Sequence, residues 1–284
     1  MAAGPMRLEL VAIPTGEEPL HGLYYEPTAA PVDGAALIFH GNQSNFYVGP
    51  PAFLPPHLAE MGLACLAFNR RGHDVVATYR GRDPVGGAFQ TTAQAIEDNE
   101  LAGRHLRQRG HPTPVVIGHS NGGTLAVRYV ADHPETPALV LLSAHCGGGR
   151  VHRKISQLGL FAGARLQELT ERARELVAAG RGRELMLLPG WWHVISAESF
   201  LDYLAGPPDL LELAPSVRCP VLFLRGADED RELYPADAFA RRAGGPCQVI
   251  DLEGCDHWYN GRDEEVGRLV TRWLSGVLRR EIPA

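Results

Sequence analysis

One segment near the middle of the chain has the residue types and spacing of a nucleophile motif. Residues 118–122 read Gly-His-Ser-Asn-Gly, a G-x-S-x-G sequence that follows an apolar segment and begins a helical pattern running past Tyr129. A sharp turn from a strand into a helix holds such a serine with its Oγ pointing out of the sheet. Glycines are needed two positions before and after the serine, because a Cβ there would collide with the neighbouring strand or helix. The first N–H groups of the helix point at negative charge developing beside the serine, so we predict that Ser120 is a nucleophile.

A serine hydroxyl attacks well only when a base removes its proton, and His257 has the position expected of that base. In architectures with this turn, the order along the chain is serine, acid, histidine. His257 lies between the last predicted strand and a helical pattern at the carboxyl end of the chain. Its order and its loop position predict that it is the general base.

Three acidic residues, Asp228, Glu229 and Asp230, follow the predicted strand 221–225. One of them can reach the far ring nitrogen of His257, fix the tautomer of the ring and stabilise the imidazolium. We predict Asp228, which is closest to the end of the strand, with Asp230 and then Glu229 as alternatives. The other position for an acid, after the preceding strand, holds no carboxylate.

The charge that forms on the substrate oxygen needs hydrogen-bond donors. The backbone N–H of Asn121, directly after the nucleophile, is one candidate. The second is expected in the loop after the third predicted strand, where His40 and Gly41 precede Asn42. We predict the N–H of Asn42, with that of Gln43 as the alternative, and expect His40 to hold the loop without transferring a proton.

These residues lie at the ends of short apolar segments that predict strands. From the third segment onward the runs are almost continuously apolar, as in strands buried on both faces of a parallel sheet. The first two are more mixed and favour an antiparallel hairpin at the edge. The predicted strands are 7–13, 20–26, 35–39, 63–68, 114–118, 138–143, 221–225 and 248–252, and helical patterns lie near 55–61, 91–109, 121–132, 236–242 and 264–279. This alternation predicts an α/β fold with a mostly parallel, doubly wound, eight-stranded sheet and right-handed crossovers.

The segment 150–216 interrupts the alternation. It contains a helical pattern at 166–179, an aromatic patch and a Gly-Pro-Pro sequence at 206–208, and no strand is evident in it. We predict a helical cap, inserted after the sixth strand over the carboxyl edge of the sheet, where ligands bind in open α/β sheets. Residues 1–149 and 217–284 then form the core.

Several residues are candidates for the wall of a substrate pocket. Trp191, Trp192 and His193, with Phe200, either stack on an acyl or aromatic group or form the small core of the cap itself. Phe46 and Tyr47 lie just beyond the oxyanion loop and are expected to form another wall. His145, at a strand end, is expected at the edge of the pocket without a role in proton transfer. The pairs Arg70-Arg71 and Arg241-Arg242 are expected to be solvated surface.

Composition excludes several classes of protein. The 284 residues carry a formal net charge of −6, whereas a nucleic-acid-binding protein needs a basic surface. No apolar run approaches the ~20 residues that span a bilayer, and the first residues lack the blocks of a signal peptide, so we expect a cytoplasmic protein that does not bind membranes. The five cysteines form no CxxC pair, which disfavours a disulfide framework or a structural zinc site.

Taken in order, these motifs resemble those of serine hydrolases of the α/β-hydrolase superfamily, and the resemblance covers nearly the whole chain. Its supporting segments are His40-Gly41, Asn69–His73, Gly118–Gly122, Gly226 with the following acids, and Gly254–His257. The resemblance implies cleavage of an ester, thioester, lactone or amide through an acyl-serine intermediate. Two departures are visible: Asn69 stands where an aspartate is frequent, and the family's acid is more often three residues after the glycine, where this chain has Glu229.

Within the superfamily, dehalogenases and epoxide hydrolases carry an aspartate at the nucleophile position, so Ser120 disfavours both. The chain contains no HExxH, GxxxxGK or strand-linked GxGxxG motif, so we expect no cofactor and no metal. We expect a small-molecule acyl substrate and a monomer or homodimer. Two alternatives use the same residues: an acyltransferase, and a ligand receptor that retains the triad with little turnover.

Overall fold

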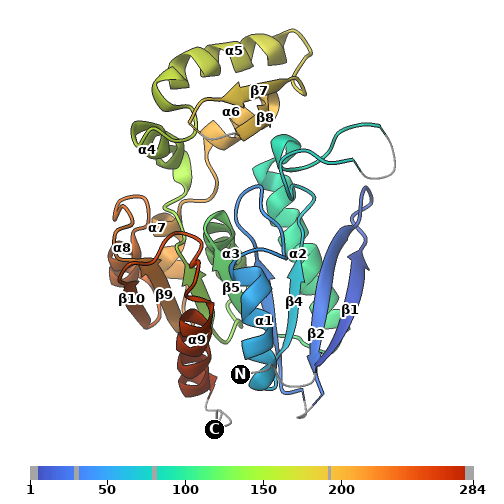
Figure 1. Ribbon diagram of the computed structural model, residues 1–284, viewed down its shortest axis with the longest axis vertical. Coiled ribbons are helices and arrows are strands. Elements are labelled where there is room, and N and C mark those ends of the chain that lie inside the picture. Colours follow the sequence, from blue (N-terminus) through green and yellow to red (C-terminus); the bar gives the residue numbers. More distant parts are fainter. Residues whose placement is uncertain (1–5, 29–31, 79–81, 191–192, 279–284) are drawn as a thin grey trace.

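The structure is a computed structural model that describes residues 6–28, 32–78, 82–190 and 193–278. Within these residues, eight strands form one sheet in the order β1-β2-β4-β3-β5-β6-β9-β10. Their bounds are β1 (Met6–Ile13), β2 (Leu20–Pro27), β3 (Ala35–Phe39), β4 (Ala64–Phe68), β5 (Val115–His119), β6 (Leu139–Leu142), β9 (Val221–Gly226) and β10 (Cys247–Leu252). β2 runs antiparallel to β1 and β4, and the other neighbours are parallel. The predicted mostly parallel sheet with an antiparallel edge hairpin is confirmed (Figure 1).

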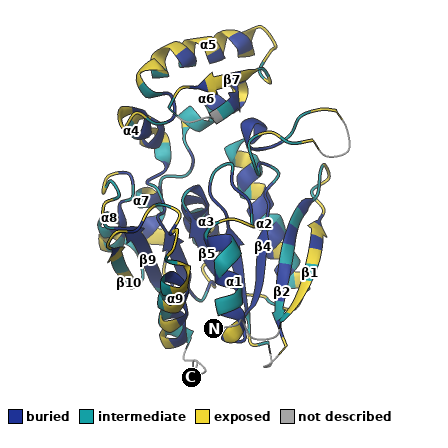
Figure 2. Cartoon of the chain, viewed as in Figure 1, coloured by how far each residue is buried: buried dark blue, intermediate teal, exposed yellow. Residues whose placement is uncertain are grey.

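The inner strands are buried on both faces, because successive side chains of a strand point to opposite sides of a sheet. Every residue of β3 is buried. Leu37 and Phe39 join the hydrophobic cluster on one face, and Ala36 and Ile38 join the cluster on the other. Figure 2 shows the inner strands as buried and the edge strand β1 as partly exposed.

Helices cover both faces of the sheet. α1 (Pro50–Glu60) and α9 (Asp263–Leu278) lie side by side on one face, and α2 (Thr92–Gln108), α3 (Asn121–Asp132) and α8 (Ala236–Arg242) pack on the other. The start of α2 is encoded locally: the Thr91 side chain accepts the N–H of Gln94, and the Gln94 side chain accepts the N–H of Thr91. This capping box satisfies donors that a helix N-terminus otherwise leaves free.

The chain between β6 and β9 forms a group of elements above the sheet (Figure 1). They are η2 (Gly148–Arg150), α4 (Val151–Gln157), η3 (Gly163–Arg165), α5 (Leu166–Ala178), β7 (Leu185–Leu188), β8 (His193–Ser196) and α6 (Ala197–Ala205). This group, called the cap below, has its own hydrophobic cluster, which includes Phe161, Ile195 and Phe200. A short 3-10 turn of the core, η1 (Gly87–Phe89), lies against β8.

The cap differs from the sequence-based expectation in two ways. β7 and β8 form an antiparallel hairpin, although no strand was expected there. Each strand has only four residues, too few for a distinct pattern of alternation. In addition, α7 (Leu210–Leu213) and η4 (Ala214–Ser216) return to the sheet, where Leu210 and Ala214 join the core cluster. No helix in the described part of the chain is both long and apolar enough to cross a membrane.

Candidate active site

Ser120 occupies the turn between β5 and α3 with φ 56° and ψ −122°, a left-handed conformation that residues other than glycine rarely adopt. Its N–H donates to the carbonyl of Leu142 at 2.9 Å, which ties the turn to the end of β6. A Cβ at Gly118 would lie 2.4 Å from the carbonyl oxygen of Gly122, and one at Gly122 would lie 2.4 Å from that of Phe39. Close packing between strand and helix therefore requires both glycines, and it holds Ser120 in its strained conformation.

The carboxylate that contacts His257 belongs to Glu229. Its Oε1 lies 2.8 Å from Nδ1 of His257. Its Oε2 accepts hydrogen bonds from the N–H of Gly226 at 2.8 Å and from the hydroxyl of Ser143 at 2.6 Å. The Glu229 side chain is only 10% exposed, so water screens this contact weakly. A carboxylate held in this way favours the neutral His257 tautomer with its hydrogen on Nδ1 and an unprotonated Nε2.

The expectation that Asp228 is the acid at His257 is wrong in the structure. Asp228 is exposed, and Asp230 forms an ion pair with Lys154 of the cap at 3.1 Å. The reason is the tight turn after β9, in which the N–H of Glu229 donates to the carbonyl of Gly226 at 3.2 Å. This turn folds the Glu229 side chain back over the strand end, whereas its two neighbours point elsewhere. The sequence did hold a signal for Glu229: in the family that the chain resembles, the acid is more often three residues after the glycine, which here is Gly226.

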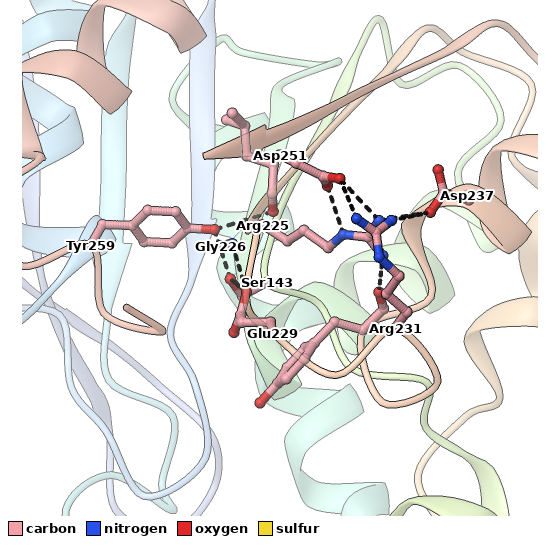
Figure 3. Close-up of polar contacts among 10 residues, drawn as sticks. Ser143, Arg225, Gly226, Glu229, Arg231, Asp237, Asp251 and Tyr259 are labelled. Atoms are coloured by element: carbon pink, nitrogen blue, oxygen red, sulfur yellow. Dashed lines mark hydrogen bonds and ion pairs between the residues drawn. The ribbon is translucent and has the colours of Figure 1, made fainter. Parts of the chain in front are cut away.

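Two residues that the sequence analysis did not single out support the acid. Ser143 follows β6 with φ 44°, and its Oγ lies between Glu229 and Tyr259, 2.8 Å from the Tyr259 hydroxyl. Tyr259 is fully buried and its hydroxyl donates to the carbonyl of Leu224 at 3.1 Å. Burial raises the pKa of the Tyr259 phenol well above its usual value, so the phenol stays protonated as a donor. Figure 3 shows Tyr259, Ser143, Gly226 and Glu229 as one connected group.

The strand end that carries Glu229 is anchored by a buried arginine. Arg225 directly precedes Gly226 and is completely buried. It forms ion pairs with Asp251 at 2.7 Å and with Asp237 at 2.6 Å (Figure 3). It also donates to the carbonyl of Tyr234 at 2.8 Å. Two carboxylates thus compensate the buried guanidinium, which joins β9, β10 and α8 beside the site.

His119 positions the backbone of His257. Its Nε2 lies 2.8 Å from the carbonyl oxygen of His257, and a carbonyl can only accept, so Nε2 carries the hydrogen. Burial lowers the pKa of His119 to about 3, and the ring is therefore neutral at pH 7. The two rings lie 4.9 Å apart, centre to centre.

The loop after β3 lies directly beside Ser120. A Cβ at Gly41 would be 3.3 Å from Cβ of Ser120. His40 is buried; its Nδ1 lies 2.7 Å from the carbonyl of Gly41, and its Nε2 accepts the N–H of Arg70 at 3.0 Å. Burial holds the pKa of His40 well below its usual value, so the ring is neutral. Both of its nitrogens are engaged in hydrogen bonds, in line with a structural role. Asn42 is the next residue of this loop.

Ser120 and His257 line one cavity of about 510 Å³ between core and cap. Both proposed oxyanion donors, Asn121 and Asn42, line it too, as does the alternative Gln43. The hydroxyl of Tyr203, on α6, donates to the side chain of Asn42. The rest of the described lining is Gly41, Val75, His145, Val151, His152, Ile155, Leu160, Phe161, Pro207, Leu233, Tyr234 and Trp258. No described residue of this lining is a lysine, arginine, aspartate or glutamate.

The predicted aromatic wall of the pocket is only partly described. Trp191 and Trp192 lie outside the described residues. The backbone of His193 pairs with Leu188 in the β7–β8 hairpin. The side chain of His193 is not part of what the structure describes. Phe200 is buried in the cap and stacks on Phe161 at 5.4 Å, so it belongs to the core of the cap. Most of the cap residues that do line the cavity lie on and directly after α4, in a segment where the sequence predicted no helix or strand.

Phe46 and Tyr47 were expected to form another wall of the pocket, and the structure places them elsewhere. Phe46 packs against the core cluster on the α1 and α9 face of the sheet, and its N–H donates to the side chain of Asn69 at 2.8 Å. Tyr47 is exposed, and its hydroxyl donates to Asp74 at 3.2 Å. Neither is among the described residues that line the cavity.

His145 lies at the cavity, as expected. Its Nδ1 accepts the N–H of Gly147 at 3.1 Å, which leaves the ring hydrogen on Nε2 in the neutral form. Burial is the main cause that lowers the pKa of His145 to about 4. A neutral imidazole with Nδ1 already occupied offers the cavity a hydrogen-bond donor at pH 7.

Arg70 and Arg71 are not solvated surface. Arg70 is completely buried, and the side chain of Arg71 is largely buried in ion pairs with Asp98 at 2.7 Å and Glu97 at 2.8 Å. Adjacent residues of one type gave no sign of this difference in the sequence. Among the described residues, no group of three or more His, Cys, Asp or Glu side chains is arranged to hold a metal ion.

Comparisons with known proteins agree with this fold. The model of the alpha/beta hydrolase family matches residues 20–269. Est1E from Butyrivibrio proteoclasticus is similar in structure, with a TM-score of 0.69 and 17% identity over 95% of this chain and 99% of its own. A thermostable carboxyl esterase from Bacillus coagulans gives 0.70 and 14% over 96% and 98%, and an esterase domain from a Rhodothermus marinus protein gives 0.65 and 20% over 97% and 99%. No curated protein matches the chain by sequence.

Proposed function

The chain belongs to the alpha/beta hydrolase family, and we propose that it is a serine esterase that cleaves an uncharged carboxylic ester or thioester through an acyl-serine intermediate. The observation that carries the proposal is the pairing of Glu229 with His257 at 2.8 Å beside a strained serine turn in the same cavity. Fold alone does not assign an activity, so the argument rests on this arrangement.

In the proposed mechanism, Oγ of Ser120 attacks the carbonyl carbon of the substrate while Nε2 of His257 accepts the hydroxyl proton. Glu229 holds Nδ1 of His257 and stabilises the imidazolium that forms. The carbonyl oxygen becomes an oxyanion, and the backbone N–H groups of Asn121 and Asn42 donate to it. The carbon–oxygen or carbon–sulfur bond to the leaving group then breaks, and His257 returns its proton to that group.

The second half of the proposed reaction repeats these steps with water. His257 removes a proton from water, which attacks the acyl-Ser120 carbonyl through a second oxyanion. The bond to Oγ breaks, Ser120 regains its proton from His257, and the carboxylic acid leaves. The neutral state of His119 and its hydrogen bond to the backbone of His257 keep the base in one place through both halves.

The cavity lining supports an uncharged substrate. Its described residues include Val151, Ile155, Leu160 and Phe161 from the cap and Leu233 from the core. A charged acyl group enclosed among them would lose its hydration without gaining an ion-pair partner. The neutral donor on His145 matches an uncharged acceptor such as an ether, hydroxyl or carbonyl oxygen. The printed names of similar structures, a carboxyl esterase and an esterase domain, agree with the ester class.

The test is hydrolysis of p-nitrophenyl esters with acyl chains of two to twelve carbons, by the wild type and by Ser120→Ala. We expect activity that the variant lacks, with an optimum at a medium chain length. Absence of activity on every ester, with both proteins folded, would contradict the esterase proposal.

A second candidate is acyl transfer to an alcohol or amine by the same residues. The observation that favours it is the apolar contribution of the cap to the cavity, through Val151, Ile155, Leu160 and Phe161, because an apolar lining disfavours water as the acceptor. Products formed with an added alcohol acceptor distinguish the two: a new ester supports transfer, and free acid alone supports hydrolysis.

A further inference from the structure

Arg70 contacts the oxyanion loop from inside the protein. It follows β4 and is completely buried. Its Nη1 donates to the carbonyl oxygen of His40 at 2.9 Å, and its Nη2 donates to that of Gly41 at 3.1 Å. Its backbone N–H also donates to the ring of His40. One arginine therefore makes three hydrogen bonds to the two residues that precede Asn42.

The guanidinium of Arg70 makes no direct ion pair with a carboxylate of the described residues, although the charge of Asp98 also acts on it. The adjacent Arg71 takes Asp98, with Glu97 and Glu17, as ion-pair partners. Burial lowers the pKa of Arg70 to about 10, so the guanidinium remains positive at neutral pH. A buried charge without a direct ion pair is costly. Arg225, which is also completely buried, is paired with two aspartates. Where Arg225 contacts carboxylates, the guanidinium of Arg70 contacts the carbonyl groups of His40 and Gly41.

The peptide unit between Gly41 and Asn42 connects the Arg70 contact with the cavity. The carbonyl of Gly41 and the N–H of Asn42 belong to one planar unit, and the described chain has no cis peptide bond. In a trans unit the two groups point in opposite directions. The carbonyl receives Arg70 and also Nδ1–H of His40 at 2.7 Å, while Gly41 and Asn42 line the cavity. Hydrogen bonds to a carbonyl also polarise the unit and strengthen its N–H as a donor.

We infer that Arg70 is a positioning residue for the oxyanion hole: its buried guanidinium fixes and polarises the Gly41–Asn42 peptide so that the N–H of Asn42 stabilises the tetrahedral intermediate. The inference rests on the proposed esterase function. If the inference holds, the guanidinium stabilises the transition state more than the bound ester, because the oxyanion forms only when Ser120 attacks.

The experiment compares Arg70→Met, Arg70→Lys and the wild type on the best p-nitrophenyl ester, with Arg71→Met as the matched control. Removing one oxyanion donor costs about 100- to 1,000-fold in kcat. Arg70 acts through that donor, so we expect Arg70→Met to lower kcat about 10- to 100-fold with little change in KM. Arg70→Lys keeps the charge without the paired geometry and should retain more kcat than Arg70→Met. Arg71→Met loses ion pairs that do not touch the loop and should lose stability with little loss of kcat per folded molecule.

A trifluoromethyl ketone with the acyl chain of that ester provides a second readout, because it forms a tetrahedral adduct with the serine. Its affinity should fall in parallel with kcat/KM across the Arg70 variants, which a purely structural defect does not require. Unchanged kcat and unchanged ketone affinity in folded Arg70→Met overturn the inference. If that variant does not fold, Arg70→Lys decides: lower kcat at constant KM supports the inference, and unchanged kcat overturns it. A wild type without esterase activity, or an equally active Ser120→Ala variant, instead contradicts the proposed function itself.

Discussion

The hydroxyl of Ser143 donates to Oε2 of Glu229 at 2.6 Å. Ser143 follows β6, Glu229 follows β9, and His257 follows β10, so this bond and the Glu229–His257 contact join three strand ends of the sheet. β6 and β9 are fully buried, and β10 extends the same parallel sheet at its edge, so neighbouring strands fix the positions of the three ends. The sheet therefore fixes the relative positions of Ser143, Glu229 and His257, and the cap contributes part of the cavity wall.

Loss of the Ser143 hydroxyl should weaken the acid without removing it. We expect Ser143→Ala to lower kcat roughly fivefold, the equivalent of about 1 kcal/mol for one hydrogen bond. Unfolding free energy should fall by about 1–3 kcal/mol, because the largely buried carboxylate of Glu229 loses a hydrogen-bond donor. The control is Ser156→Ala, whose buried hydroxyl has no hydrogen-bond partner among the residues that the structure describes. Equal kcat in the two variants, measured by ester hydrolysis, would argue against a role for Ser143.

The identity of the acid is tested by a pair of neighbouring substitutions. Glu229→Gln preserves the shape of the side chain but not its charge, and we expect kcat to fall about 100- to 10,000-fold. Asp228→Asn changes an exposed carboxylate and should leave kcat within about twofold of the wild type. The reverse order of these two losses in steady-state kinetics would show that Asp228 is the acid.

His119 predicts a specific pH dependence of stability. Its pKa of about 3 in the folded protein is below the usual value near 6.5, so the unfolded chain binds this proton more readily. The unfolded state then gains protons as the pH falls below about 6.5, and stability is lost progressively towards pH 3. Between pH 7 and pH 5 this one group should cost about 2 kcal/mol.

The His119→Gln variant lacks that titration but keeps an amide donor. Its unfolding free energy, measured in urea at pH 7 and pH 5, should fall by about 2 kcal/mol less than that of the wild type over this interval. His40 and His145 remain in both proteins, so their contributions cancel in the comparison. An identical pH dependence in the two proteins would refute the neutral, buried state of His119.

The cap wall should set the length of acyl chain that the cavity accepts. Ile155→Trp adds volume at a lining position, so we expect the ratio of octanoate to acetate hydrolysis to fall at least about tenfold. Val177→Trp is the control, because Val177 is exposed on α5 and away from the lining. Parallel loss of activity on both esters would indicate general damage to the cap and not a change of pocket size.

Much of this fold could be predicted from the sequence because its signals are local. The apolar runs that form β3 and β5 and the glycines around Ser120 each act over a few positions. The predicted strands of the sheet therefore agree with the structure to within a residue or two at their ends. The two glycines beside Ser120 could also be assigned a packing role in advance, because each approaches a neighbouring backbone.

The remaining features depend on contacts between distant segments. Asp228, Glu229 and Asp230 are consecutive, and only the turn after β9 decides which one reaches His257. Arg70 and Arg71 are likewise adjacent and identical, and their different surroundings come from β3 and α2. The β7–β8 hairpin is too short for a periodic signal. Phe46 and Tyr47 lie away from the cavity because the loop after β3 turns away from the site before it reaches them. No local sequence pattern encodes the direction of that loop.

The most direct test of the central claim is covalent labelling of the nucleophile by a fluorophosphonate, followed by intact-protein and peptide mass spectrometry. The account predicts one adduct, on Ser120, that is absent from Ser120→Ala and forms much more slowly in His257→Ala and Glu229→Gln. No adduct on the folded wild type, or an adduct that persists in Ser120→Ala, would contradict the claim that His257 and Glu229 activate Ser120.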